Sequence, residues 1–181
     1  MRIIGGEWGG RKIHPPSKMP FTRPTTDIAK EGLFNILQSN REIKGLKTLD
    51  LFGGTGSISF ELASRGASDL TIVEKDRQML DFIRITAETL GLKQLKIIPS
   101  DVFLFLKNNK EQYDFIFAGP PYALETIDQL PEYVIKGNFL KDNGWFVLEH
   151  TPRNRYKDFP LFVTERNYGT TLFSIFIHKK K

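Results

Sequence analysis

Two short segments of the chain hold residue types that could act on a nucleoside. Residues 48–56 read TLDLFGGTG, so the acid Asp50 and a cluster of glycines follow an apolar run. Residues 117–122 read FAGPPY, a second apolar run that ends in two prolines and an aromatic ring. Glycines let a ligand lie against bare backbone, and a rigid proline corner with a ring offers a stacking surface for a flat base. The two segments therefore predict one loop for a nucleoside cofactor and one for a target base.

An alternation of strands and helices would bring these segments to one edge of a sheet. A helix capped by Thr25 or Thr26 should run to about residue 37, and residues 159–164 and 171–178 resemble a closing hairpin. This order predicts an α/β fold with a mostly parallel, doubly wound, Rossmann-like sheet and a C-terminal antiparallel hairpin, in which ligands bind at the carboxyl ends of the strands. The predicted strands cover residues 46–52, 70–74, 95–98, 113–118 and 145–149, and the helices between them cover residues 55–65, 77–90, 102–106 and 127–135.

The first 24 residues differ from the rest of the chain. They hold two Gly-Gly pairs and four prolines, and residues 3–4 could pair with residues 11–13 in a short hairpin. We expect a basic N-terminal extension over residues 1–24, followed by a single domain over residues 25–181 that holds the cofactor.

Composition excludes several other classes of protein. A chain of 181 residues with 40% hydrophobic and 26% charged residues is typical of one globular domain. No apolar run is long enough to span a bilayer, and the first residues lack the apolar stretch of a signal peptide, so we expect a cytoplasmic protein. There is no cysteine, and the three histidines lie far apart, so we expect no metal site.

Charge is distributed unevenly along the chain. Residues 1–23 carry a net charge of +4 and residues 151–181 a net charge of +5, whereas the body between them carries −4. An acidic body with two basic ends suits a polyanion that touches the ends while a cationic cofactor sits in the body. The alternative, that the basic ends only aid solubility, fits the final three lysines better than the N-terminal segment.

Acids and glycines at three predicted strand ends are the candidates for the cofactor site. Glu74 ends the second strand, where a carboxylate can accept hydrogen bonds from both hydroxyls of a ribose, and Asp101 follows the third, where it could accept from an adenine amino group. The complete candidate set is Asp50, Phe52, Gly53, Gly54, Gly56, Glu74, Lys75, Asp101 and Val102.

A dinucleotide is the main rival ligand for the glycine loop. The Gly-x-Gly-x-x-Gly template, placed on Gly54 and Gly56, meets Ser59 at its third glycine. A pyrophosphate favours positive surroundings, which Asp50 opposes, whereas S-adenosylmethionine has cationic sulfonium and amino groups and no phosphate. We therefore predict S-adenosylmethionine rather than a nicotinamide cofactor. The plainer interpretations are an ordinary strand-to-helix turn for the loop and a helix cap for Asp101.

Residues Gly119, Pro120, Pro121 and Tyr122 are the candidates for the catalytic corner. The lone pair of an exocyclic amine is delocalised into the base, so a methylating site accepts hydrogen bonds from the amine and aims its lone pair at the methyl group. The usual acceptors are an Asp or Asn side chain and the carbonyl of the first proline, with the aromatic ring stacked on the base. The alternative is a simple proline loop after a core strand.

Seven stretches spread over nearly the whole chain carry a family resemblance. They lie at residues 2–11, 23–37, 50–57, 73–74, 118–122, 146–149 and 168–171. These stretches resemble the bacterial 16S rRNA guanine-N2 methyltransferases of the RsmD family. The segment that begins Arg23-Pro24-Thr25-Thr26 is the most specific of them, because many methyltransferases share the glycine loop.

The resemblance implies a function as well as a fold. It implies a class I methyltransferase fold, S-adenosylmethionine as methyl donor, and one guanine of 16S rRNA as target, with the partly assembled small (30S) subunit as the true substrate. Contacts to the RNA would come from Arg2, Arg11, Lys12, Arg23 and Thr25. We expect the protein to act as a monomer.

Gly119 is the one departure from the family pattern, which has Asp or Asn at this position. Losing one hydrogen bond to the target amine should cost roughly 1.5–3 kcal/mol, or about 10- to 100-fold in rate. The alternative hypothesis is therefore a weakened or inactive protein that binds S-adenosylmethionine and acts as an rRNA-binding assembly factor. A DNA adenine or cytosine methyltransferase is less favoured, because the residues after Tyr122 are needed to close the sheet and leave no separate recognition region.

Overall fold

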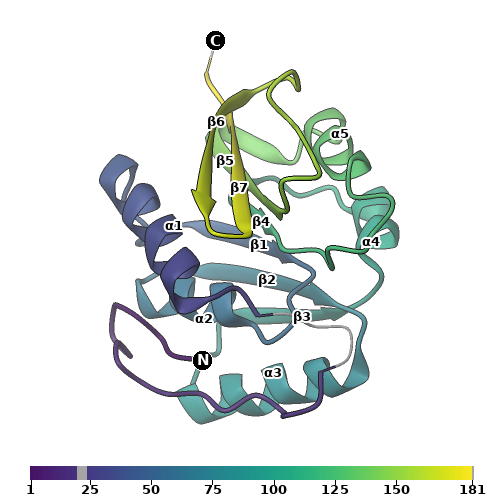
Figure 1. Cartoon of the computed structure of the whole chain (residues 1–181). Helices are drawn as coiled ribbons and strands as arrows, with labels where there is room; N and C mark the ends of the chain where they lie inside the picture. Colours follow the sequence, from purple (N-terminus) through teal and green to yellow (C-terminus); the bar gives the residue numbers. More distant parts are fainter. Residues whose placement is uncertain (20–23, 181) are drawn as a thin grey trace.

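A seven-stranded sheet forms the centre of the computed structural model, which describes residues 1–19 and 24–180 (Figure 1). The strands are ordered β3-β2-β1-β4-β5-β7-β6. Their bounds are β1 (Lys47–Leu51), β2 (Asp69–Glu74), β3 (Leu95–Pro99), β4 (Tyr113–Ala118), β5 (Leu140–His150), β6 (Phe162–Tyr168) and β7 (Thr171–His178). The helices are α1 (Asp27–Asn40), α2 (Ser57–Ser64), α3 (Arg77–Leu90), α4 (Val102–Asn108) and α5 (Gln129–Lys136).

The strand pairing confirms the predicted doubly wound sheet. β3, β2, β1, β4 and β5 pair in parallel, while β7 pairs antiparallel with both β5 and β6. Strand order reverses between β1 and β4, which is the topological switch point where ligands of such sheets bind. None of the helices in the described residues is both long and apolar enough to cross a membrane.

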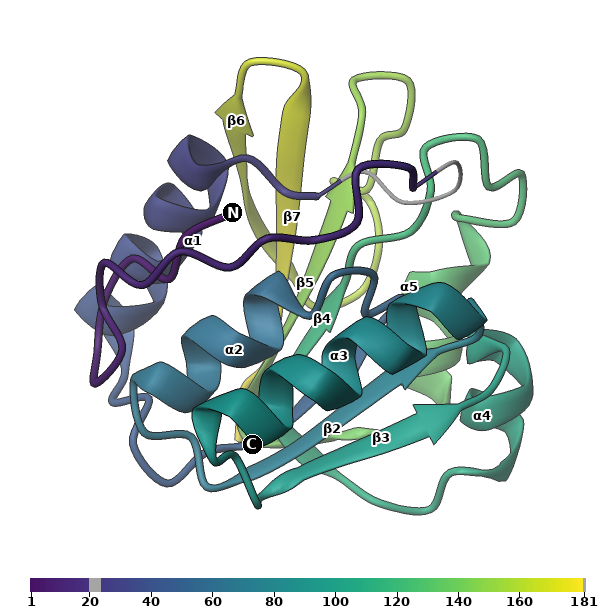
Figure 2. The same cartoon turned by 90° about the horizontal axis from the view of Figure 1, so that it is seen from below.

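Side chains that alternate along the strands point into two apolar cores, one on each face of the sheet. Along β4, Phe115 and Phe117 join the cluster that contains residues of α1, α2 and α3. Ile116 and Ala118 join the cluster that contains residues of α4 and α5. Figure 2 shows the two groups of helices on opposite sides of the sheet. Burial on both faces explains why these strands appear in the sequence as nearly continuous apolar runs.

Several predicted element boundaries were wrong for local reasons. The helix predicted from residue 55 begins at Ser57, because Gly56 adopts a left-handed φ of 73° and serves as its N-cap. The helix predicted to end near residue 37 continues to Asn40, and its N-cap is Thr26, whose Oγ1 accepts from Ala29 N at 3.2 Å. The last hairpin starts at Phe162 rather than residue 159, because Leu161 has a left-handed φ of 66°.

The N-terminal hairpin is reduced to a single antiparallel bridge between Arg2 and Lys12. Ile3 and Ile13 beside that bridge are nevertheless buried in the core. The segment from Met1 to Ile13 is therefore packed against the sheet domain (Figure 2).

A buried ionic network fastens this segment to α1 and α2. The carboxylate of Glu61, fully buried on α2, accepts hydrogen bonds from Ile4 N at 2.8 Å and Gly5 N at 2.9 Å. Arg65 donates to the same carboxylate at 2.8 Å. Lys30 Nζ lies 3.7 Å from it and donates to Arg2 O and to Ser57 Oγ. Burial lowers the pKa of Lys30, an effect that the charge of Glu61 opposes.

We predict that Glu61→Ala lowers the free energy of unfolding by about 3–5 kcal/mol, because it leaves two buried cations and two backbone N–H groups without their acceptor. Chemical denaturation measures the change. Glu88→Ala on α3 is the matched control, since Glu88 is exposed, and it should stay within about 0.5 kcal/mol of the parent. A loss below about 1 kcal/mol for Glu61→Ala would show that the network does not hold the segment.

Candidate active site

A cavity of about 710 Å³ opens at the carboxyl ends of β1 to β5. This volume lies within the range of roughly 300–1,000 Å³ that is usual for small-molecule and cofactor sites. Thirteen of the predicted site residues line it: Thr25, Asp50, Phe52, Gly53, Gly54, Glu74, Lys75, Asp101, Val102, Gly119, Pro120, Pro121 and Tyr122. The cavity thus joins the predicted cofactor loop and the predicted base corner in one space.

The glycine loop after β1 is tightly constrained. Phe52 has a left-handed φ of 62°, which is uncommon for a residue with a bulky side chain and is typical of strained functional loops. Gly53 donates to Val73 O at 2.9 Å, and a Cβ on Gly53 would lie 2.4 Å from Ile72 Cγ1. Gly56 is buried and is not among the lining residues. Gly56 is needed for the turn into α2, where a Cβ would lie 2.7 Å from the Phe60 ring.

Glu74 is held against the loop by three backbone donors. One carboxylate oxygen accepts from Gly54 N at 2.7 Å, and the other accepts from Lys75 N and Asp76 N at 2.8 Å each. A carboxylate has about four acceptor positions, so this arrangement fixes its orientation while further donors can still bind. Glu74 is therefore positioned to accept from the hydroxyls of a ribose.

Asp50 is a buried acid beside the same loop. It is 2% exposed and accepts a hydrogen bond from Ser59 Oγ at 2.8 Å. Burial raises the pKa of Asp50 from 3.8 to about 7, an effect that the Ser59 hydroxyl opposes. Among the ion pairs of residues 1–19 and 24–180, none involves Asp50. A cationic ligand would supply the missing counter-charge.

Asp101 is both a helix cap and part of the rim of the cavity. Its Oδ1 accepts from Phe103 N at 2.9 Å and from Leu104 N at 3.3 Å, so the plainer interpretation, a cap of α4, describes its contacts. Its Oδ2 lies 3.5 Å from the Nζ of Lys75, which is largely exposed. The pair lies beside the loop that Glu74 holds.

The Pro-Pro corner after β4 is joined to the end of β1 by a hydrogen bond from Gly119 N to Leu51 O at 3.2 Å. Pro120 is buried and Pro121 is exposed, and Leu124 N donates to Pro121 O at 2.9 Å, which closes a turn. Tyr122 is half-buried. The corner is therefore rigid and places an aromatic side chain in the wall of the cavity.

Glu149, at the end of β5, is a lining residue to which sequence analysis gave no role. It is 5% exposed and accepts hydrogen bonds from Tyr122 OH at 3.0 Å and Thr25 Oγ1 at 2.5 Å. The Tyr122 hydroxyl also lies 3.1 Å from Thr171 Oγ1. The signal was present in the sequence, since Glu149 is an acid that ends a predicted strand, as Glu74 is.

The residues predicted to contact RNA are not gathered in the cavity, apart from Thr25. Arg2, Arg11 and Lys12 are exposed on the N-terminal segment that the Glu61 network anchors. Arg23 lies outside the described residues.

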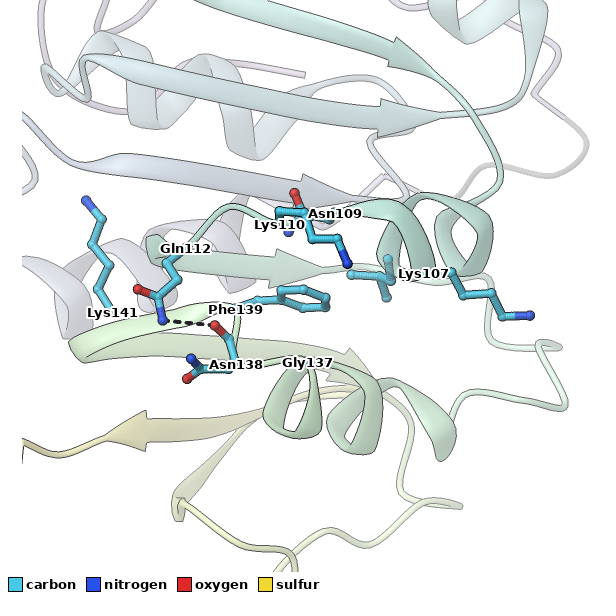
Figure 3. Close-up of a pocket in the computed structure, with 9 residues that line it drawn as sticks. Lys107, Asn109, Lys110, Gln112, Gly137, Asn138, Phe139 and Lys141 are labelled. Carbon is cyan, nitrogen blue, oxygen red and sulfur yellow. Dashed lines mark hydrogen bonds between the residues drawn. The ribbon is translucent and has the colours of Figure 1, made fainter.

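A second cavity, of about 610 Å³, lies at the opposite ends of the strands (Figure 3). Its lysines do not converge: Lys107 and Lys141 point away from one another, and Lys141 is paired with Asp114 at 3.0 Å. The carboxyl ends of α4 and α5 meet there and carry partial negative charge, which disfavours an anion. The cavity at the switch point is therefore the candidate active site.

The sheet order, the glycine loop after β1, the acid that ends β2 and the Pro-Pro-aromatic corner after β4 define a class of protein, the class I S-adenosylmethionine-dependent methyltransferases. A family model described as "Conserved hypothetical protein 95" matches residues 1–177. Ribosomal RNA small subunit methyltransferase D of Escherichia coli (strain K12) is 34% identical over 149 residues, which is 82% of this chain and 71% of the relative. The chain belongs to this family, the RsmD family of methyltransferases.

Two solved structures extend the comparison. The putative methyltransferase yhhF from Escherichia coli superposes with a TM-score of 0.86 at 26% identity, covering 100% of this chain and 99% of that one. A 16S rRNA N2 guanine methyltransferase (RsmC) of T. thermophilus, in complex with AdoMet and guanosine, superposes with a TM-score of 0.69 at 23% identity over 88% of this chain and 45% of that one. The second likeness shows a shared fold.

We predict that Glu74→Ala weakens binding of S-adenosylmethionine by about 10- to 100-fold, because hydrogen bonds to an ionised group contribute roughly 1.5–3 kcal/mol and the loop also loses its anchor. Isothermal titration calorimetry measures the dissociation constant, and exposed Glu88→Ala should match the parent. If Glu74→Ala bound S-adenosylmethionine as tightly as the parent does, Glu74 would not be the residue that holds the ribose.

Asp50 should make cofactor binding depend on pH. Because its pKa is raised to about 7, the site holds a proton below that pH, and binding of a cation should weaken about tenfold from about pH 8 to pH 6. Asp50→Asn should remove most of this dependence and weaken binding at the higher pH. If the affinity of Asp50→Asn depended on pH as strongly as that of the parent, the pH dependence would come from another group.

The raised pKa of Asp50 also makes the stability of the cofactor-free protein depend on pH. Stability should fall as the pH rises, whereas cofactor binding should strengthen. A raised pKa in the folded state means that stability falls as pH rises from about 4 to 7, and ionised Asp50 costs stability above that window. Asp50→Asn should therefore unfold at a higher temperature than the parent at about pH 8. At about pH 4 the melting temperatures of the variant and the parent should converge. A lower melting temperature for the variant at both pH values would contradict the raised pKa of Asp50.

Proposed function

We propose that the protein transfers a methyl group from S-adenosylmethionine to the exocyclic N2 of a guanine in 16S rRNA. The observation that carries the proposal is the cavity at the switch point, which joins the acid-lined glycine loop to the Pro-Pro-Tyr corner across β1 and β4. Membership of the RsmD family supports rRNA as the substrate. The shared fold of the guanosine-bound RsmC structure is compatible with a guanine target.

The residues of the cofactor half fit S-adenosylmethionine. Its sulfonium and amino groups are cationic and it has no phosphate, which suits the buried carboxylate of Asp50. Glu74 would hold the ribose, and Asp101 with Val102 would border the adenine. When bound, the cofactor supplies an electrophilic methyl group. The protein's part is to orient that group toward the corner at residues 119–122.

The corner would hold the target base. The Pro120 carbonyl would accept from the amine and the Tyr122 ring would stack on the base. A base reaches such a pocket when it leaves its stack or lies in a single-stranded region of the RNA.

The basic ends would dock the RNA outside the cavity. Residues 1–23 carry a net charge of +4, and their exposed Arg2, Arg11 and Lys12 stand on a segment that is packed against the domain. Arg23 belongs to the same proposed contact. We propose a monomer without a metal that acts in the cytoplasm on a partly assembled 30S subunit, where an unpaired guanine is held in a fixed setting.

A second candidate function rests on Gly119, which gives the target amine no side-chain acceptor. On this reading the protein binds S-adenosylmethionine and rRNA as an assembly factor and transfers the methyl group slowly or not at all. The retained acids Asp50, Glu74 and Asp101 in the cavity favour the enzyme instead.

We predict that the chain transfers labelled methyl from S-adenosylmethionine to small subunits isolated without this modification, and that Glu74→Ala fails to do so under the same conditions. Mass spectrometry of the digested RNA should identify N2-methylguanosine. A different methylated nucleoside would refute the guanine-N2 assignment.

Gly119→Asp, assayed alongside, separates the two candidate functions. A silent parent with an active Gly119→Asp would favour the assembly factor, and silence from both would refute the enzyme. The added side chain would meet the Phe117 ring, since a Cβ at position 119 lies 3.0 Å from Phe117 Cε1. The melting temperature of the variant therefore has to be measured with its activity.

A further inference from the structure

We propose that the loop after β5 is a second docking site for RNA, in which Arg153, Arg155 and Lys157 bind backbone phosphates beside the base corner. The inference rests on the proposed function and adds a contact that lies on the other face of the sheet from the N-terminal segment. One stretch of RNA would then cross the mouth of the cavity between two basic surfaces.

Side chains of this loop alternate between solvent and the interior. Arg153, Arg155 and Lys157 are exposed, whereas Tyr156 between them is fully buried. The single acid Asp158 follows the three cations, so the stretch carries a net charge of +2. The loop therefore presents positive charge on its outer side and is held in place on its inner side.

Tyr156 fixes the loop to the domain. Its ring packs edge-on against His150, with centroids 4.8 Å apart, and against Phe176 of β7, with centroids 6.4 Å apart. Its hydroxyl donates to Asp128 Oδ1 at 2.7 Å, and Asn154 Nδ2 donates to the same oxygen at 3.2 Å. Because Asp128 is the N-cap residue of α5, the loop is tied to the segment that follows the Pro-Pro corner. The cations on either side of Tyr156 thus project from a fixed segment, which reduces the conformational entropy lost on binding.

The loop begins at the edge of the sheet where the cavity opens. β5 runs parallel to β4, and Glu149 near its carboxyl end lines the cavity two residues before the loop starts. Figure 2 shows the loops after β4 and β5 at the same end of the sheet. Tyr156 belongs to the apolar core that contains residues of α4 and α5. The loop therefore borders the base corner on the α4 and α5 face.

The N-terminal segment occupies the opposite face of the sheet. Ile3 and Ile13 belong to the core that contains residues of α1, α2 and α3. Arg2 O accepts from Lys30 Nζ, which also donates to Ser57 Oγ, and Ser57 lines the cavity. The proposed N-terminal contacts and the loop after β5 therefore flank the cavity from opposite faces, and the base corner lies between them.

The phosphates of RNA suit these side chains. A guanidinium group can donate two parallel hydrogen bonds to one phosphate, and a lysine adds a compact charge. Contacts on both sides of the cavity would hold the backbone while the guanine between them leaves its stack and enters the corner. Because such contacts position the RNA without reading its bases, they should govern affinity for the substrate and leave the chemical step unchanged.

The binding test compares two triple variants that have the same change in charge. The loop variant carries Arg153→Gln, Arg155→Gln and Lys157→Gln. The control variant removes three exposed cations at the amino ends of the strands, by Lys44→Gln, Lys93→Gln and Lys110→Gln. With S-adenosylhomocysteine bound, the loop variant should bind small subunits isolated without the modification about 10- to 100-fold more weakly than the parent at about 0.1 M salt. The slope of log affinity against log salt concentration should fall by about 2, and the control variant should stay within about threefold of the parent.

Methyl transfer separates docking from chemistry. The loop variant should raise the KM for small subunits about 10- to 100-fold, while kcat, the dissociation constant of S-adenosylmethionine and the melting temperature stay near the parent values. Equal losses of affinity in the loop variant and the control variant would show a general effect of charge and would overturn the proposal.

The two assays together distinguish the failure of this inference from the failure of the proposed function. A parent that binds subunits through the loop but transfers no methyl group would refute the proposed function and leave the docking site standing. An active parent whose loop variant binds subunits as tightly as the parent does would refute only the docking site.

A proximity test locates the RNA. The chain has no cysteine, so Lys157→Cys and Lys12→Cys each provide one attachment point for an iron–EDTA probe that cleaves nearby RNA. Cleavage from the two positions should fall on opposite sides of the target guanine, within one stretch of 16S rRNA, and Lys93→Cys should give no cleavage there. Weaker subunit binding by the loop variant without RNA cleavage from Lys157→Cys would assign the loop to a ribosomal protein and overturn the RNA contact.

Discussion

The parallel pairing of β1 with β4 is the constraint on which the candidate site depends. Leu51 lies opposite Ala118, and the hydrogen bond from Gly119 N to Leu51 O continues that register one residue beyond the strands. The cofactor loop and the base corner therefore start from adjacent points at the switch point of the sheet. A slip of one residue would move one loop by roughly 3.3 Å relative to the other and exchange the two faces of the strand. Reacting atoms have to lie about 3–3.5 Å apart, so methyl transfer needs this register.

Three buried acids show how the molecule separates scaffold from site. Glu61 is neutralised by Lys30 and Arg65, and its bonds fasten the N-terminal segment. Asp50 accepts a hydrogen bond from the Ser59 hydroxyl and has a raised pKa, so its charge is costly until a cation binds. Glu149 accepts hydrogen bonds from the hydroxyl groups of Thr25 and Tyr122 at the wall of the cavity. The counter-charge distinguishes Glu61 from Asp50, because an acid paired with cations of the protein stabilises the fold, whereas a buried acid in the wall of a cavity favours a cationic ligand.

The sequence predicted those features that depend on local pattern. Apolar runs bounded by glycines predicted the five parallel strands, and acids at strand ends predicted Asp50, Glu74 and Asp101 as lining residues. The start of α2 was wrong because Gly56 and Phe52 take left-handed conformations that propensity does not reveal. Glu149 received no role although it ends a predicted strand as Glu74 does, because the contacts that bring it into the cavity cannot be read from the sequence. Its environment is created by Thr25, Tyr122 and the β4–β5 pairing, which join residues far apart in the chain.

Gly119 illustrates the difference between a motif and a site. A motif is a run of residues along one strand. After β4, Gly119 stands where the family pattern has Asp or Asn, so the side-chain acceptor for the target amine is missing from the motif. A site is assembled across strands, and the neighbouring position on β5 carries a carboxylate within 3.8 Å of the missing Cβ. The chemistry that a methylated amine requires is an acceptor at a point in space, whichever strand provides it. On this view the effect of a change in a motif residue depends on the groups that the adjacent strands place around it, as well as on the residues along its own strand.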